Sequence, residues 1–311
     1  MAAHYCNCEL FALTPVTSEK GFTVIRTCML GLCLAACIAA PVRAAESPFG
    51  YSYTAETEER GETEVAIWAT DRRGKDAGHY DAQDYRLEVE RGVTDRFQVA
   101  AYLNAASHHV RGLDPRIENV QRSFAFDGAS LELKYRVLDE KRDGIGLALY
   151  AEPGWSRIHD VEGERGTEYE LELKAIASKS FADGRLLWAA NFTFEPEWER
   201  ERIAGAGGAV SHDWEKELKL QATTGLAYRV AANWSAGLEA RYASVYPDWT
   251  ERLHREASAV SAGPVVAFHS GEWSASLTYL PQLFGSGTPA SGRSLDEFEK
   301  REIRLRISRE F

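Results

Sequence analysis

Residues Glu168–Lys174 read EYELELK, and the strict alternation of this stretch decides the fold class. Tyr169, Leu171 and Leu173 occupy the odd-numbered positions, and charged residues occupy the even-numbered positions. Successive side chains of a β-strand point to opposite faces, so this stretch has one apolar face and one charged face. A helix would mix the two sets around its surface. We therefore predict a strand that separates an apolar medium from a polar one.

The same period-2 pattern recurs along the chain from residue 62 to the end. No Pro/Ser-rich linker interrupts it, which indicates one domain. The predicted strands are Glu62–Thr70, Asp84–Glu90, Phe97–Asn104, Ser130–Val137, Ile145–Glu152, Glu168–Ala177, Leu186–Glu195, Glu217–Val230, Trp234–Ala243, Ala259–Phe268, Trp273–Leu280 and Glu302–Phe311.

The connections between these strands alternate in length. The short ones are Arg91–Arg96, Asp139–Asp143, Ala182–Gly184, Ala231–Asn233 and Ser270–Glu272. The long ones are Asp71–Gln83, Ala105–Ala129, Pro153–Thr167, Pro196–Lys216, Ser244–Ser258 and Pro281–Arg301. Short periplasmic turns and long extracellular loops are typical of bacterial outer-membrane barrels, which have an even number of strands. We therefore predict an all-β fold: a single 12-stranded antiparallel transmembrane β-barrel over residues 62–311.

Residues 45–61 precede the first strand. A strand at 47–59 would make the number odd, so parity excludes it from the wall. We expect a periplasmic or lumen-entering N-terminal segment here.

Residues 1–44 have the order of a secretory signal. An apolar stretch at 27–42 follows Arg26, and Val42-Arg43-Ala44 supplies small residues at the outer positions of a cleavage site. The leader is long, and Val24-Ile25-Arg26 would open a conventional signal. Leu34-Ala35-Ala36-Cys37 resembles a lipobox, so lipidation of Cys37 remains an alternative to its removal.

Composition excludes several classes of protein. The five cysteines all lie before residue 38, so neither a disulfide framework nor a cysteine metal site is available to the folded region. No apolar run long enough for a transmembrane helix follows residue 45. A net charge of −11 argues against nucleic acid as a partner. A soluble β-sandwich would also alternate, but it seldom shows such regular alternation of loop length. Several aromatic residues lie near strand ends, as in interfacial girdles: Trp155, Trp188, Trp198, Trp214, Trp234, Tyr246, Trp249 and Trp273.

The C-terminal strand carries a resemblance to bacterial outer-membrane β-barrel proteins. Ile303, Leu305 and Ile307 alternate up to a final aromatic residue, Phe311, and look like the assembly signal of that class. Arg309 departs from the apolar residue expected there. The turn Glu90–Arg96 is similar to the periplasmic turns of many such proteins. The opening Phe49–Thr54, with Arg60-Gly61, looks like a family of uncharacterised predicted outer-membrane proteins. The resemblance implies a Gram-negative outer membrane, with its lipid, periplasmic chaperones and the barrel-assembly machinery as partners.

If the apolar faces point to lipid, the charged faces line the lumen. The predicted lumen-lining residues are Glu64, Arg86, Glu88, Glu132, Lys134, Arg136, Glu170, Glu172, Lys174, Glu195, Lys219, Arg229, Glu239, Arg241, Arg304 and Arg306. Closure of the barrel would bring Glu64 near Arg304 or Arg306. Twelve strands lie between a filled barrel and an open channel. We expect either a narrow charge-lined channel for small polar solutes or a closed structural or surface-binding barrel.

Other chemistry has weaker support in the sequence. His79, His108, His109, His159, His212 and His254 fall in expected extracellular loops but lack a metal-ligand spacing. Glu195 and Glu197 could mimic a glycosidase pair. No GxSxG occurs, and Gly205–Gly208 lacks the residues of a P-loop. We therefore expect no enzyme, cofactor or metal, with a membrane-edge lipid hydrolase as the third reading.

Overall fold

The computed structural model describes residues 47–113, 119–204, 210–286 and 291–311. The predicted signal peptide, Cys37 and Gly205–Gly208 lie outside these residues. The strands are β1 (Thr63–Arg73), β2 (His79–Thr94), β3 (Phe97–Arg111), β4 (Val120–Leu138), β5 (Gly146–Ile158), β6 (Arg165–Phe181), β7 (Leu186–Ala204), β8 (Val210–Ala231), β9 (Trp234–Pro247), β10 (Ala257–Ser270), β11 (Trp273–Ser286) and β12 (Arg301–Glu310). One short helix, α1 (Glu140–Asp143), connects β4 to β5.

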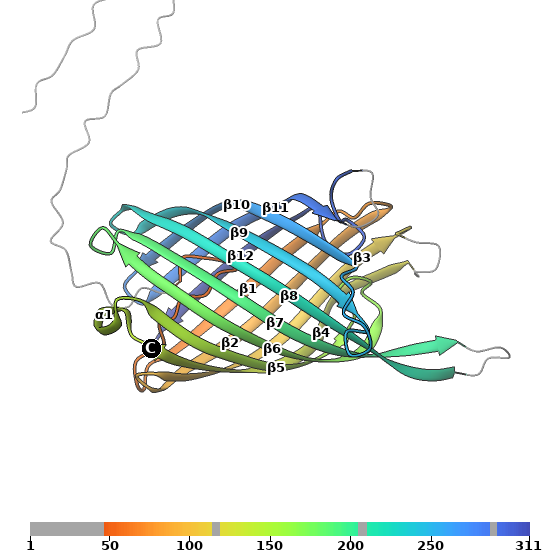
Figure 1. Cartoon of the computed structure of the whole chain (residues 1–311), viewed down its shortest axis with the longest axis horizontal. Coiled ribbons are helices and arrows are strands. Elements are labelled where there is room, and N and C mark those ends of the chain that lie inside the picture. Colours follow the sequence, from red (N-terminus) through yellow and green to blue (C-terminus); the bar gives the residue numbers. More distant parts are fainter. Residues whose placement is uncertain (1–46, 114–118, 205–209, 287–290) are drawn as a thin grey trace, which may run out of the picture. The chain divides into compact units, whose positions relative to one another are not determined.

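The strands form a closed antiparallel barrel in which each pairs with its neighbours in sequence (Figure 1). β1 closes the barrel against β12, with Ile67 opposite Ile307. The predicted strand number and the single barrel are therefore confirmed. Within the described residues, no helix is long and apolar enough to span a membrane.

The observed strands run further than the alternation indicated, mainly at the end that carries the long connections. We call this the loop end, and the opposite one the turn end. β7 and β8 pair up to Ala204 and Val210, so most of the loop expected at Pro196–Lys216 is a protruding hairpin (Figure 1). His79, His108, His109 and His212 likewise lie in strands, not in loops as expected. Main-chain hydrogen bonds between strands need no apolar face, so a ladder can continue where the alternation stops.

The two faces of the wall differ as the alternation requires. Ile67 and Leu238 on the outer face are 60% and 66% exposed, whereas Glu64 and Glu239 on the inner face are each 1% exposed. An apolar exterior is stable only against an apolar medium. Aromatic pairs lie near both ends of the wall: Trp234 with Phe268 at the turn end, and Tyr169 with Trp214 at the loop end.

Candidate functional site: the barrel lumen

The predicted lumen-lining residues lie on the inner face and fall into three groups. A large cavity toward the loop end is lined by Arg86, Glu170, Glu172, Lys174, Glu195, Lys219, Arg241 and Arg304. A smaller cavity toward the turn end is lined by Glu64, Glu88, Glu132, Lys134 and Arg306. The remaining three bond elsewhere: Arg136 to Glu56, Arg229 to the Gly184 carbonyl, and Glu239 to main-chain groups of the N-terminal segment.

The seam between the first and last strands is bridged inside the barrel. Arg306 on β12 forms an ion pair with Glu64 on β1, the pairing that closure was expected to produce. Nearby, Glu88 accepts hydrogen bonds from Trp68 Nε1 (2.7 Å) and the Tyr102 hydroxyl (2.8 Å). Charges taken out of water need such partners, since an unpaired one is costly.

Residues 47–59, here called the N-terminal segment, lie inside the barrel. The segment is not a strand of the wall, and its contacts reach from β3 to β12. Glu58 N–H donates to Gln98 on β3, Ala55 N–H to Ser178 on β6, and Tyr53 exchanges two hydrogen bonds with Asn191 on β7. The Gly50 carbonyl accepts from Arg304 on β12 at 3.0 Å. The segment therefore lies across the lumen.

Glu239 on β9 holds the segment most tightly. Its carboxylate accepts main-chain N–H bonds from Gly50, Tyr51 and Ser52, each at 2.9 Å. The Thr278 hydroxyl donates a fourth bond at 2.7 Å. Hydrogen bonds to an ionised group are stronger than neutral ones, and several on one carboxylate favour its charged form.

Small residues of the wall make room for the segment. The Phe49 ring packs on Ala189, Ala227 and Val265. A Cβ atom at Gly225 would lie 2.6 Å from that ring, so only glycine fits beneath it. The inner face is thus apolar where it contacts Phe49, whereas the rest of the inner face is charged.

The segment lies between the two cavities, since Tyr51 and Tyr53 line both. The smaller cavity has a volume of about 90 Å³ and the larger about 860 Å³. A water molecule occupies roughly 30 Å³ of liquid. The larger cavity, which we call the chamber, can therefore hold a hydrated small solute.

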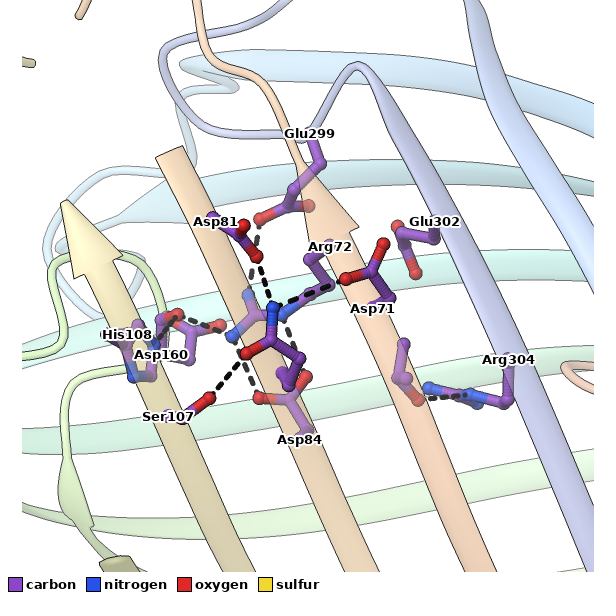
Figure 2. A network of polar contacts seen from close by, with 12 residues as sticks. Asp71, Arg72, Asp81, Asp84, Ser107, His108, Asp160, Glu299, Glu302 and Arg304 are labelled. Carbon is purple, nitrogen blue, oxygen red and sulfur yellow. Dashed lines mark hydrogen bonds and ion pairs between the residues drawn. The ribbon is translucent and has the colours of Figure 1, made fainter. Parts of the chain in front are cut away.

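Residues 159–164, the loop between β5 and β6, turn into the loop end of the lumen; we call them the mouth loop. The Asp160 carbonyl accepts hydrogen bonds from Arg72 (2.6 Å) and His108 (3.1 Å), as Figure 2 shows. Arg72 also forms ion pairs with Asp84 (2.8 Å) and Glu299 (3.2 Å). Arg72 therefore ties the mouth loop to β2 and to the connection before β12.

The opposite side of the mouth loop reaches β7 and β8. His159 Nε2 lies 3.1 Å from a Glu199 oxygen, and the Asp160 carboxylate lies 3.5 Å from Lys219 Nζ. Gly163, at φ +72°, packs against the His108 ring, where a Cβ atom would approach to 2.6 Å. Contacts on both sides fix the mouth loop across the entrance.

Charges on the mouth loop are stabilised by their surroundings. Burial disfavours the charged form of His159, but the hydrogen bond to Glu199 and the nearby Asp160 raise its pKa to about 10. Burial also opposes ionisation of Asp160, yet Lys219, His159 and Arg72 lower its pKa well below the usual value. Both groups are therefore charged at neutral pH.

Acidic side chains greatly outnumber basic ones in the chamber. Among the described residues, nineteen Asp and Glu line it, against seven Lys and Arg. Much of the excess lies on an acidic wall formed by Glu168, Glu170, Glu172, Glu195, Glu197 and Glu217 on β6, β7 and β8. Glu170 is directly opposite Glu197 in the strand register. Like charges at such positions repel, and a cation between them would relieve the repulsion.

The basic residues of the chamber are too few to offset this excess, and most of them are paired with neighbouring carboxylates. Arg86 pairs with Glu152, Arg241 with Glu302, and Lys174 with Glu172. Lys219 lies 2.8 Å from Glu197 and 3.7 Å from Glu217. Among the described side chains, carboxyl groups without a basic partner remain on the acidic wall, and in their ionised form they favour cations over anions.

In the described part of the chain, three clusters of carboxyl groups have ligand oxygens within 4.8 Å of one another, close enough to hold a metal ion. They are Glu58, Glu64 and Glu310; Glu88, Glu90 and Glu132; and Glu168, Glu170 and Glu197. Glu88 accepts from Trp68 and Glu132 from Gln98, and the Tyr102 hydroxyl lies between the two carboxyl groups and donates its one hydrogen to either. Of the histidines, His79 and His109 meet edge to face, with ring centroids 4.9 Å apart.

Sequence reasoning missed the mouth loop and the way in which the N-terminal segment is held. Asp160 and Glu299 lie in connections, where no periodicity assigns a direction to a side chain. Gly163 and the acidic residues around it were the available signal for an ordered turn. For the segment, Gly50 between Phe49 and Tyr51 was the corresponding signal.

Solved structures of outer-membrane barrels are similar to this chain in fold. The COG4313 outer membrane channel from Pseudomonas putida F1 is 15% identical, with a TM-score of 0.56 over 82% of this chain and 97% of that one. The β domain of the Bordetella autotransporter Brka is 12% identical, with a TM-score of 0.50 over 81% of this chain and all of that one. At these identities the likeness shows the fold alone, that of an outer-membrane β-barrel.

The comparison with curated proteins gave no match. A family model does match residues 41–311, which include every strand of the barrel. Its description assigns no activity. The chain belongs to the "Family of unknown function (DUF6662)".

Proposed function

We propose that the protein is a channel of the bacterial outer membrane for small polar solutes, with a preference for cations. The observation that carries the proposal is the chamber of about 860 Å³ inside a closed barrel, lined mainly by carboxylates. Clefts lined by one sign of charge concentrate ions of the opposite sign. A fold of this type also occurs in the outer membrane channel from Pseudomonas putida F1.

In this conformation the channel is closed by the N-terminal segment and narrowed by the mouth loop. Conduction then requires the segment to leave its position beneath the chamber. Glu239 makes the strongest contacts with the segment, so its charge sets how often the segment leaves. Glu195 and Glu197 act in this proposal as part of the acidic wall, not as a catalytic pair, and the protein is not an enzyme.

A closed structural barrel is the second candidate, favoured by the ion pair between Glu64 and Arg306 and by the occupied lumen. Single-channel recording of the refolded protein in planar bilayers separates the two. We expect brief openings for the wild type. Glu239→Gln keeps the shape of the Glu239 side chain but removes its charge, so we expect longer or more frequent openings for this variant. In a KCl gradient, the reversal potential should indicate cation preference.

The matched control is Glu272→Gln, the same change at an exposed carboxylate that pairs with Arg309 outside the lumen. It should behave as the wild type. Absence of current in the wild type and in Glu239→Gln, with the barrel correctly folded, would leave the closed barrel as the better reading.

A further inference from the structure

The contacts between the N-terminal segment and the wall mostly use main-chain atoms of the segment. Four inner-face side chains accept its N–H groups: Glu239 on β9, Asn191 on β7, Ser178 on β6 and Gln98 on β3. We call these four residues the main-chain track. Their partners lie between Gly50 and Glu58, so the track follows this part of the chain, which bends at Gly50–Tyr51 and at Ala55.

Side chains of the segment add shallow pockets between the track residues. Phe49 lies over Gly225, and Ala55 packs with Ala148 and Ile176. Tyr51 stacks under the Arg304 guanidinium at 4.0 Å. Recognition of an extended peptide commonly combines main-chain hydrogen bonds, which give affinity, with pockets for alternate side chains, which give preference.

We propose that the main-chain track is a binding site for a polypeptide segment, and that residues 49–58 are its resident ligand. The part of this inference that concerns transport rests on the proposed function. It names short peptides as the transported solutes, and these bind the main-chain track when the N-terminal segment leaves it. The acidic wall above the track favours peptides with a free ammonium terminus or basic side chains.

The geometry of the acceptors separates a peptide from other polar solutes. Three consecutive N–H groups meet one carboxylate, and Asn191 both accepts from and donates to the main chain of Tyr53. Sugars and simple cations do not offer consecutive donors with a paired acceptor at this spacing. A peptide offers one main-chain donor and one acceptor at each residue other than proline, and a bend lets consecutive donors meet one carboxylate.

Exchange on the track can be tested in the whole barrel with one introduced cysteine. The chain from residue 45 has no cysteine. Ser52 is 2% exposed, and no partner for its Oγ is found among the described residues, so Ser52→Cys removes no hydrogen bond. The introduced thiol is protected from a water-soluble maleimide while the segment is seated. The rate of labelling therefore measures departure of the segment.

The probe is a synthetic peptide of residues 47–59, added at millimolar concentration because a tethered segment has a millimolar effective concentration of its own. The control peptide has the same sequence with N-methyl groups at Tyr51 and Ser52, which removes two donors to Glu239. Each such bond corresponds to about a tenfold change in affinity, so the control should bind about 100-fold more weakly. Glu272→Cys, at an exposed position, reports the intrinsic rate of the reagent.

We expect the unmodified peptide to accelerate labelling of Ser52→Cys at least tenfold and the methylated peptide to leave it unchanged. Equal acceleration by both peptides would mean that side chains carry the binding and would overturn a main-chain site. Protection that persists at every peptide concentration would overturn an exchangeable site. Labelling does not depend on conductance. A barrel that never conducts would therefore contradict the channel proposal without affecting the labelling result.

Discussion

At the scale of single residues, His159 is a titratable group that connects the mouth loop to β7 through its contact with Glu199. Its pKa of about 10 lies above the usual value of 6.5, because Glu199 and Asp160 favour the imidazolium despite its burial. A group whose folded pKa is raised contributes stability that is fully present below the unfolded pKa. That contribution decreases as the pH rises from 6.5 and is lost above about 10.

We therefore expect His159→Gln to lower the free energy of unfolding by about 2 kcal/mol at pH 6, the usual contribution of a hydrogen bond to a charged group. The difference from the wild type should shrink through pH 8 and disappear above pH 10. Denaturant unfolding of both proteins across this range measures it. A difference that does not change with pH would mean that His159 is not held as an imidazolium.

At the scale of elements, β12 closes the barrel up to its last residue. Phe311 N–H donates to the Thr63 carbonyl at 2.8 Å, and Thr63 N–H donates back at 3.4 Å. Ile303, Leu305 and Ile307 lie on the outer face of this strand, each with a largely exposed side chain. The seam between the two chain ends thus depends on the terminal residue for its final pair of hydrogen bonds.

Deletion of Phe311 should impair assembly of the barrel and leave export to the periplasm intact. The expected readouts are several-fold less folded protein in the outer membrane and an undiminished periplasmic pool in a strain without periplasmic proteases. Phe311→Tyr, which keeps a terminal aromatic ring, is the matched control. Normal folded levels without Phe311 would show that the last strand is not the assembly signal.

At the scale of the whole molecule, the charge of the chamber is distributed unevenly around the wall. The chamber arginines on β1, β2 and β9 are paired with carboxylates, whereas β6, β7 and β8 carry carboxylates in excess. A unit charge about 10 Å from a permeating ion, at the dielectric constant of water, contributes about 0.4 kcal/mol, or about twofold in occupancy. Selectivity therefore arises from the sum over the acidic wall.

By this reasoning the double variant Glu170→Gln/Glu195→Gln should lower the cation-to-anion permeability ratio about sixteenfold, because each lost charge halves the occupancy by cations and doubles that by anions. The control Glu251→Gln/Glu272→Gln removes the same net charge at exposed positions away from the chamber. Reversal potentials in salt gradients give both ratios, measured in the Glu239→Gln background to increase open time. An equal effect of the two double variants would assign selectivity to overall charge instead of the acidic wall.

The sequence by itself determined the barrel: the strand number, the inner and outer faces and the pairing of first and last strands. These follow from the alternation of residues along each strand and from the alternation of short and long connections. Both patterns depend only on residues that are near one another in the sequence. The charged inner face was predictable for the same reason, from Glu64 to Arg306. Strand ends at the loop end were not, because ladder hydrogen bonds continue without any pattern of side chains.

Only the tertiary structure decided what occupies the lumen. Gly50 and Glu239 are 189 positions apart, and no periodicity connects a main-chain N–H to a distant carboxylate. The mouth loop is similar, because Asp160 meets Arg72 and Lys219 from strands on different sides of the barrel. Alternation fixes which face a side chain takes, whereas closure of the barrel decides which faces meet. The sequence therefore determined the wall of the barrel, but it did not determine what occupies the lumen.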